Sequence, residues 1–194
     1  MSHAIWSSPV SQSHLPQRPI TREEWEEDWA RREDWLELVN GILTLSPREN
    51  GLNMRAARRL SEALAAVLGE GWERFTHMAL RLTPHPGATI RFPDLTVVRP
   101  IGLIDTDELD AADVALVVEV LSPSTHRTDL TDKRREYASA DIPAYVIIDR
   151  ERAPRLRLLT DPADGDYRTE RSGETVTLRI ASHDIVVNAS DIIR

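Results

Sequence analysis

Helical periodicity predicts two helices in the first third of the chain. Residues 21–34 open with a capping-box pattern, in which Thr21 is followed three residues later by Glu24, and tryptophans follow at helical spacing. Apolar residues recur every four positions over residues 52–68, and Gly69 supplies a stop signal. We therefore predict a first helix over 21–34 and a second, amphipathic helix over 52–68.

Shorter apolar runs predict strands in the remainder of the chain. Asn40-Gly41 separates the runs 36–39 and 42–45, which is the strongest short signal for a β-hairpin. The apolar run 115–121 is short enough to be a strand that is buried on both faces. Further strands are predicted over 75–82, 90–98, 144–148, 155–160, 167–170, 175–180 and 185–187, with an acidic connection over 101–113 and a polar helix over 128–140.

This order of elements predicts an α/β (mixed α+β) fold, with a central mixed sheet flanked by helices. The chain has 194 residues, which is close to the size of one globular domain. Residues 1–19 contain Ser, Pro, His and Gln with little apolar content, and we expect them to form a flexible tail. Residues 20–194 are then expected to form a single domain.

Composition restricts the class of protein. No apolar run approaches the length that crosses a bilayer, and residues 1–19 lack the features of a secretory signal. The chain has no cysteine, which excludes disulfides and thiolate metal sites and fits a reducing compartment. We expect a cytoplasmic protein without membrane contact. The net charge of −8 argues against a general nucleic-acid coating protein, but not against an enzyme whose site is built from carboxylates.

Two carboxylates lie where the sequence is otherwise apolar. Alternation along residues 90–98 places Asp94 on the same side as Phe92 and Val98. Glu119 lies within the most apolar run of the chain. A buried carboxylate is costly unless it is paired or bound to a cation, so a structural salt bridge explains either residue alone. Two such residues on neighbouring strands favour a divalent cation such as Mg²⁺, which uses one or two carboxylates together with water and phosphate.

Lys133 is the only lysine among 24 basic residues. It follows Asp129 by four residues and lies at the margin of the apolar face of the polar helix, where its ammonium can point inward. The alternative is an exposed helical pair of Asp129 and Lys133, which would contribute little. Because arginine cannot replace a compact ammonium, the single use of lysine favours a functional role.

These residues form a series that resembles a known family. The series resembles the Uma family of putative restriction endonucleases, within the PD-(D/E)XK nuclease superfamily, over most of the chain from Thr21. The segments that carry the resemblance are Pro93-Asp94, Glu119 within 117–125, Asp129, Lys133 and Tyr137, the segment 141–149 and the upstream segment 35–43.

The resemblance implies a restriction-endonuclease-like core that cleaves phosphodiesters with Mg²⁺ or Mn²⁺. Asp94 and Glu119 match the metal-binding carboxylates, and Glu37 matches an N-terminal acidic residue that is a further candidate ligand. The superfamily usually has lysine two residues after the glutamate, where this chain has Leu121. In the family this lysine is displaced to the next helix, and Lys133 matches that position.

The expected reaction is metal-assisted hydrolysis of a phosphodiester in nucleic acid, with DNA as the first choice of partner and a homodimer left open. Asp94 and Glu119 would hold the cation together with the Val120 carbonyl, and Lys133 would stabilise charge, since a free lysine titrates near ~10.4. Two alternatives stay open. One is an inactive nuclease fold that binds DNA or protein, favoured by Asn53 where family members often have histidine. The other is a phosphohydrolase acting on small substrates.

Overall fold

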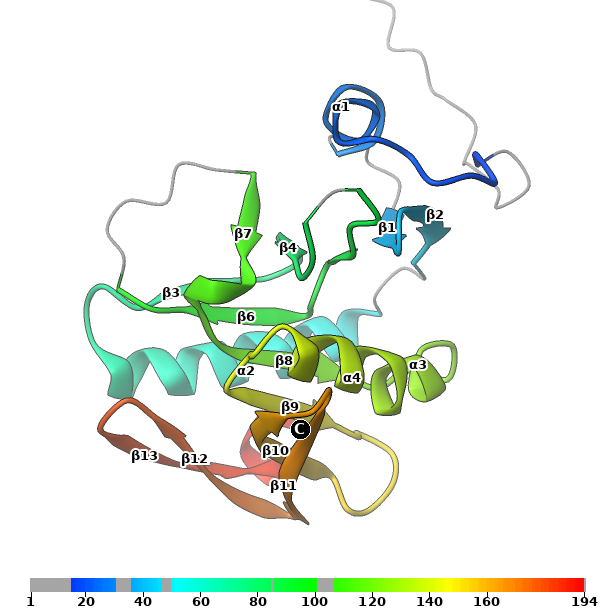
Figure 1. The fold of residues 1–194 in the computed structure, drawn as a ribbon. Coiled ribbons are helices and arrows are strands. Elements are labelled where there is room, and N and C mark those ends of the chain that lie inside the picture. The colour runs from blue at the N-terminus through cyan, green and yellow to red at the C-terminus, as the bar shows by residue number, and fades with distance from the viewer. Residues whose placement is uncertain (1–14, 31–35, 47–49, 85, 101–106, 194) are drawn as a thin grey trace, which may run out of the picture. The chain divides into compact units, whose positions relative to one another are not determined.

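A computed structural model describes residues 15–30, 36–46, 50–84, 86–100 and 107–193 (Figure 1). The chain forms two compact units. The first comprises residues 1–48 and 83–91, and the second comprises residues 49–82 and 92–194. The predicted tail 1–19 lies mostly outside the described residues, and Leu15 near its end is buried. The prediction of a single domain over 20–194 stays a prediction.

The first unit contains the predicted hairpin. Strands β1 (Leu36–Val39) and β2 (Ile42–Leu45) pair antiparallel, as predicted. Asn40 and Gly41 both have positive φ, 50° and 81°, which the two-residue turn requires. Strand β5 (Ile90–Arg91) pairs antiparallel with β1. The unit also contains α1 (Arg22–Glu24) and the π-helix η2 (Trp25–Trp29).

A six-stranded mixed sheet forms the centre of the second unit. Its strand order is β11-β10-β9-β8-β6-β3, and all neighbours are antiparallel except β8 and β9, which are parallel. In chain order these strands are β3 (Glu73–Phe75), β6 (Leu95–Val98), β8 (Val114–Val120), β9 (Ala144–Ile148), β10 (Leu156–Ala163) and β11 (Asp166–Gly173). A parallel pair needs a crossover connection, and two helices between β8 and β9 provide it.

The remaining elements of the second unit flank this sheet. Strands β4 and β7 pair in parallel, and β12 and β13 form a separate antiparallel ladder. Their bounds, with those of the helices, are α2 (Gly51–Leu68), β4 (Ala79–Arg81), β7 (Glu108–Asp110), the 3-10 helix η3 (Ala111–Asp113), α3 (His126–Leu130), α4 (Asp132–Ser139), β12 (Thr175–Ile180), β13 (His183–Asn188) and α5 (Ala189–Ile193).

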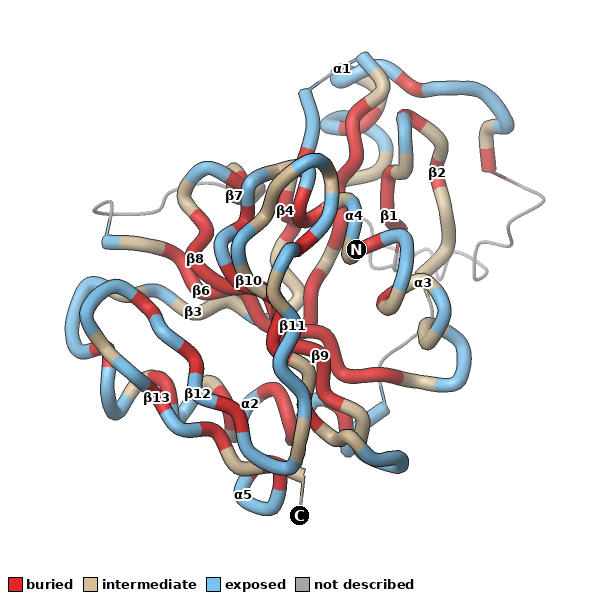
Figure 2. Tube along the Cα trace, turned by 60° about the horizontal axis from the view of Figure 1, so that its bottom comes forward, coloured by how far each residue is buried: buried red, intermediate tan, exposed pale blue. Residues whose placement is uncertain are grey.

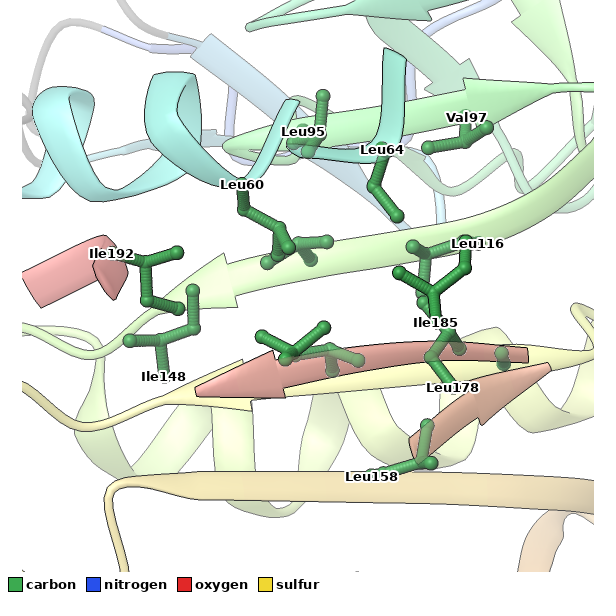
Figure 3. Packing of buried hydrophobic residues seen from close by; sticks show 14 of the residues in the cluster. Leu60, Leu64, Leu95, Val97, Leu116, Ile148, Leu158, Leu178, Ile185 and Ile192 are labelled. Atoms are coloured by element: carbon green, nitrogen blue, oxygen red, sulfur yellow. The ribbon is translucent and has the colours of Figure 1, made fainter. Parts of the chain in front are cut away.

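The inner strands of the central sheet are buried on both faces. Figure 2 shows β6, β8 and β9 buried along almost their whole length, whereas β12 and β13 alternate between buried and exposed positions. Because side chains alternate across a strand, Leu116 packs with the cluster of α2, α5 and the β12–β13 ladder (Figure 3). Val117 packs on the other face in a second cluster, with Tyr137 of α4. Glu119 lies two residues further along β8 than Val117 and therefore faces α4.

The strands predicted over 75–82 and 90–98 are each interrupted. His77 separates β3 from β4 with a φ of 54°, and its N–H donates to the Pro93 carbonyl at 3.0 Å. Pro93 has no N–H and cannot continue a ladder, so Asp94 lies just before β6 rather than within a strand. The prediction of one continuous strand over 90–98 is therefore wrong, although Asp94 is buried as expected.

Two predicted helices are also divided. The polar helix 128–140 breaks at Thr131 into α3 and α4, where the Thr131 hydroxyl donates to the Arg127 carbonyl at 2.7 Å. The capping box of Thr21 and Glu24 is confirmed, but after α1 the described chain continues as the π-helix η2. Residues 31–35, part of the first predicted helix, lie outside the described residues.

The mixed α+β architecture with a central mixed sheet and flanking helices is confirmed. Helix α2 and strands β8, β9 and β12 lie close to their predicted bounds. Strand β7 and helix η3 lie within the predicted acidic connection, and α5 was not predicted. None of the helices in the described ranges is both long enough and apolar enough to cross a membrane.

We predict that truncating the sheet-facing side of α2 destabilises the protein. Leu60 is 0% exposed within the first core cluster, so Leu60→Ala should lower the free energy of unfolding by about 2–5 kcal/mol. Leu52 on the same helix is 51% exposed, and Leu52→Ala should change the free energy of unfolding by less than about 0.5 kcal/mol. Urea denaturation measures both. Equal losses in the two variants would contradict this packing.

Candidate active site

Asp94 is held by the backbone at the end of β8. Its side chain is only 4% exposed, and its Oδ2 accepts a hydrogen bond from the Val120 N–H at 2.6 Å. Its Oδ1 lies 3.5 Å from His77 Nε2. This arrangement follows from the break at Pro93, because Asp94 is then free to turn toward β8 instead of continuing the β6 ladder.

Glu119 faces the crossover helices. Its Oε1 accepts hydrogen bonds from the Lys133 ammonium at 2.8 Å and from the Tyr137 hydroxyl at 2.6 Å. Both donors come from α4, one turn apart, so a single helix face fixes this carboxylate. The pairing of Leu95 with Val118 places Asp94, which precedes β6, beside Glu119. The structure therefore brings the predicted residues Asp94, Glu119 and Lys133 together.

Lys133 and Asp129 do form an ion pair, but not an exposed one. Lys133 Nζ lies 3.2 Å from Asp129 Oδ1, and the two side chains are 6% and 1% exposed. The alternative of a solvated helical pair is therefore excluded. The Tyr145 hydroxyl donates a hydrogen bond to the backbone carbonyl of Asp129 at 3.0 Å and thereby connects the end of α3 to β9. The ammonium thus lies between two buried carboxylates.

Burial shifts the pKa values of two carboxyl groups in this cluster. Loss of hydration raises the pKa of the Glu119 carboxyl well above its usual value, and the Asp129 and Asp94 charges raise it further while Lys133 lowers it. Loss of hydration also raises the pKa of Asp129, against the opposing effect of Lys133. One ammonium does not balance three neighbouring carboxylates, and a further cation would relieve the excess negative charge.

The Val120 peptide group connects the carboxylates to α2. While its N–H holds Asp94, its carbonyl accepts a hydrogen bond from Asn53 Nδ2 at 3.1 Å. Asn53 is fully buried, and its Oδ1 accepts from Arg150 Nε at 2.7 Å. The carbonyl predicted as a metal ligand is thus already engaged, although a carbonyl oxygen keeps a second lone pair. Asn53 links the start of α2, the end of β8 and the loop after β9.

The third predicted ligand, Glu37, has a different partner. It belongs to the first unit, where its Oε2 lies 2.6 Å from Arg91 Nη1 and both side chains are buried. Within the part of the chain that the structure describes, no group of three or more His, Asp or Glu side chains is arranged to hold a metal. A role for Glu37 at the cation stays a prediction.

Asp94 and Glu119 nevertheless have the chemistry of a two-carboxylate cation site. In each, the protein fixes one oxygen, Oδ2 of Asp94 and Oε1 of Glu119. The second oxygen of Asp94, Oδ1, lies 3.5 Å from His77 Nε2. Hard oxygen donors of this kind, completed by water and phosphate, suit Mg²⁺ or Mn²⁺. The residues present therefore fit such a cation.

The structure adds residues to the site that the sequence did not assign to it. His77 lies beside Asp94, and Arg150 reaches Asn53 across 97 positions of sequence. Neither has a periodic or spacing signal that could have revealed it. Tyr137 did have one, because it follows Lys133 by four residues on the same helix face.

We predict that the Glu119 charge lowers the stability of the metal-free protein as pH rises. A carboxyl whose folded pKa is raised contributes stability that is full below its unfolded pKa and is lost as pH increases through the folded pKa. Between pH 5 and 8 with a chelator, the free energy of unfolding should therefore fall by up to about 1.4 kcal/mol per pH unit. Glu119→Gln should make that slope shallower, as measured by urea denaturation.

Asp132 provides a matched control on the same helix, because it is exposed. Asp132→Asn removes one acidic charge from the surface and should leave the slope at its wild-type value. An unchanged slope in Glu119→Gln would mean that the Glu119 carboxyl is not destabilised by burial.

Comparisons with known proteins identify a family and a similar fold. The sequence model of a family described as Uma2, putative restriction endonuclease, matches residues 22–188. A search of curated proteins finds no match. Among solved structures, the chain is similar to a putative nuclease belonging to DUF820 from Anabaena variabilis ATCC 29413, with a TM-score of 0.69 and 15% sequence identity.

That similarity covers 90% of this chain and 98% of the other, and it confirms the predicted nuclease-like fold. The family match covers most of the chain, including Asp94, Glu119 and Lys133. The resemblance drawn from the sequence is thus confirmed at the level of the family. The chain belongs to the Uma2 family of putative restriction endonucleases.

Proposed function

We propose that the protein is a divalent-metal-dependent endonuclease that hydrolyses phosphodiester bonds of nucleic acid, with DNA as the preferred substrate. The observation that carries the proposal is the pairing of the only lysine with a buried glutamate, 2.8 Å apart, beside a second buried carboxylate. Membership in a family of putative restriction endonucleases supports the same reaction.

Asp94 and Glu119 are the residues that would hold Mg²⁺ or Mn²⁺. When bound there, the cation would polarise a phosphate oxygen and lower the pKa of a coordinated water. The protein's own contribution is orientation. The Val120 N–H fixes the Asp94 carboxylate, and Tyr137 with Lys133 fixes that of Glu119, so little rearrangement is needed on binding.

Lys133 is the positively charged side chain to which we assign a catalytic role, in addition to the metal ion. Its ammonium is largely desolvated, and charge–charge interactions are stronger there than in water. We assign it the stabilisation of negative charge on the attacking water or on the phosphate. Asp129 and Tyr137 are positioning residues, because Asp129 holds the ammonium and Tyr137 holds the carboxylate that the ammonium contacts.

The proposal predicts that Lys133 cannot be replaced by arginine. The planar guanidinium is larger than an ammonium and does not fit a pocket in which the Lys133 side chain is 6% exposed. Lys133→Arg and Lys133→Ala should each lower the rate of supercoiled-plasmid cleavage with Mn²⁺ by on the order of 100- to 1,000-fold. Circular dichroism should show that both variants fold.

Arg134 provides a matched control next in the sequence. It pairs with Asp166 and Glu170 nearer the surface, so Arg134→Lys should cleave at close to the wild-type rate. Activity of Lys133→Arg near that of the wild type would contradict the assignment of Lys133. If the wild type binds DNA with Mn²⁺ but does not cut it, the protein is a binding module rather than a nuclease.

A further inference from the structure

A hollow of about 430 Å³ opens beside Asp94, and we call it the α2 hollow. All of its lining belongs to the second unit and comes from the first turns of α2, the segment after β3 and Asp94 itself. Asp94 is the only one of the three proposed active-site residues that reaches it. The residues that matter for its chemistry are Met54, Arg55, Arg58, Thr76, His77 and Asp94.

The hollow has a basic rim. Arg55 and Arg58 are three residues apart on α2, so they lie on the same side of the helix, and both are exposed. Arg55 forms no ion pair or hydrogen bond with any residue in the described ranges. Arg58 pairs with Glu62 on the exposed helix surface, an interaction that costs little to exchange for another anion. Two guanidinium groups can therefore contact an anionic ligand.

The inner end of the hollow has the opposite charge. Asp94 repels a bare anion, so a phosphate can approach it only together with a cation. The amides at the start of α2 are also engaged, because Asn50 Oδ1 accepts hydrogen bonds from the N–H groups of Leu52 and Asn53, both at 3.0 Å. The arginine side chains, rather than the helix terminus, are therefore the groups that can hold phosphate.

Apolar surface lies between the rim and the inner end. Met54 is 51% exposed at the hollow, and Ala57 lines it as well. A flexible, polarizable methionine adapts to flat or irregular apolar surfaces. Inorganic phosphate offers no such surface, whereas the sugars and bases of a nucleotide chain do.

We propose that the α2 hollow binds the sugar–phosphate backbone of the nucleic acid next to the phosphodiester that is cleaved. Arg55 and Arg58 contact flanking phosphates, and Met54 packs against a sugar or base. This inference rests on the proposed nuclease function, since it takes Asp94 as the position of the reacting phosphate. It makes α2 the helix that aligns the strand over the carboxylates.

The test is DNA binding by the full chain in a Lys133→Ala background, which keeps the substrate intact in Mg²⁺. Fluorescence anisotropy with a short labelled duplex gives the dissociation constant at several salt concentrations. Adding Arg55→Gln and Arg58→Gln together should weaken binding roughly tenfold. It should also make the plot of log affinity against log salt less steep, reducing the magnitude of its negative slope by about two. Adding Arg179→Gln instead removes one exposed positive charge on β12 and should change neither quantity.

Three results would overturn the inference. The first is an affinity and a salt slope in the double arginine variant equal to those of the background, and the second is no binding of the duplex by the background protein. Competition by a mononucleotide or inorganic phosphate at the same phosphate concentration as the duplex would also overturn it, because the hollow would then be a small-phosphate site.

Failure of this inference can be distinguished from failure of the nuclease proposal. If the wild type cleaves plasmid but binding does not depend on Arg55 and Arg58, the inference is wrong and the nuclease proposal stands. If binding depends on these arginines but the wild type does not cleave, the hollow binds nucleic acid without catalysis.

Discussion

The ammonium of Lys133 lies between the carboxylates of Glu119 and Asp129, with Asp94 beside them, and all four residues are buried. Removing such charges from water costs several kcal/mol for each ion, and well-packed apolar residues are often equally or more stable in the same place. Stabilising the fold is therefore a weak explanation for the cluster. Its excess of negative charge is what a site for a divalent cation requires.

The secondary structure around the cluster serves to hold these charges in place. Pro93 ends one ladder, so Asp94 can turn to the Val120 N–H. Helix α4 crosses the sheet face with Lys133 and Tyr137 one turn apart, and both donate to the same oxygen of Glu119. On the opposite face, Asn53 binds the Val120 carbonyl. One peptide group of β8 thus links α2 to the Asp94 carboxylate.

The sequence predicted those parts of the molecule that have a local physical signal. Asn40-Gly41 gave the hairpin turn because both positions need positive φ, and the four-residue apolar repeat gave α2. Asp94, Glu119 and Lys133 are the site residues that the sequence predicts, because each is chemically out of place in its surroundings. The break at Thr131 was missed, since a single hydroxyl bonding to a carbonyl four residues earlier competes with the helix without changing the apolar pattern.

Long-range polar contacts were beyond sequence reasoning for a different reason. The hydrogen bond of Arg150 to Asn53 joins elements that only the folded sheet brings together, and His77 reaches Asp94 through a loop with positive φ. Such contacts have no period along the chain. The sequence could therefore identify the charged centre of the site but not the residues that connect it to α2 and to the loop after β9.

The central claim is that Asp94 and Glu119 form a cation site rather than a purely structural charge cluster with Lys133, and metal-dependent stability tests it most directly. A ligand that binds only the folded protein raises the free energy of unfolding by about 2.7 kcal/mol at one hundred times its dissociation constant. In the wild type, increasing Mn²⁺ should raise the free energy of unfolding in this way, whereas Asp94→Asn should show little or no increase over the same range. An equal increase in both proteins, or none in the wild type, would contradict the account.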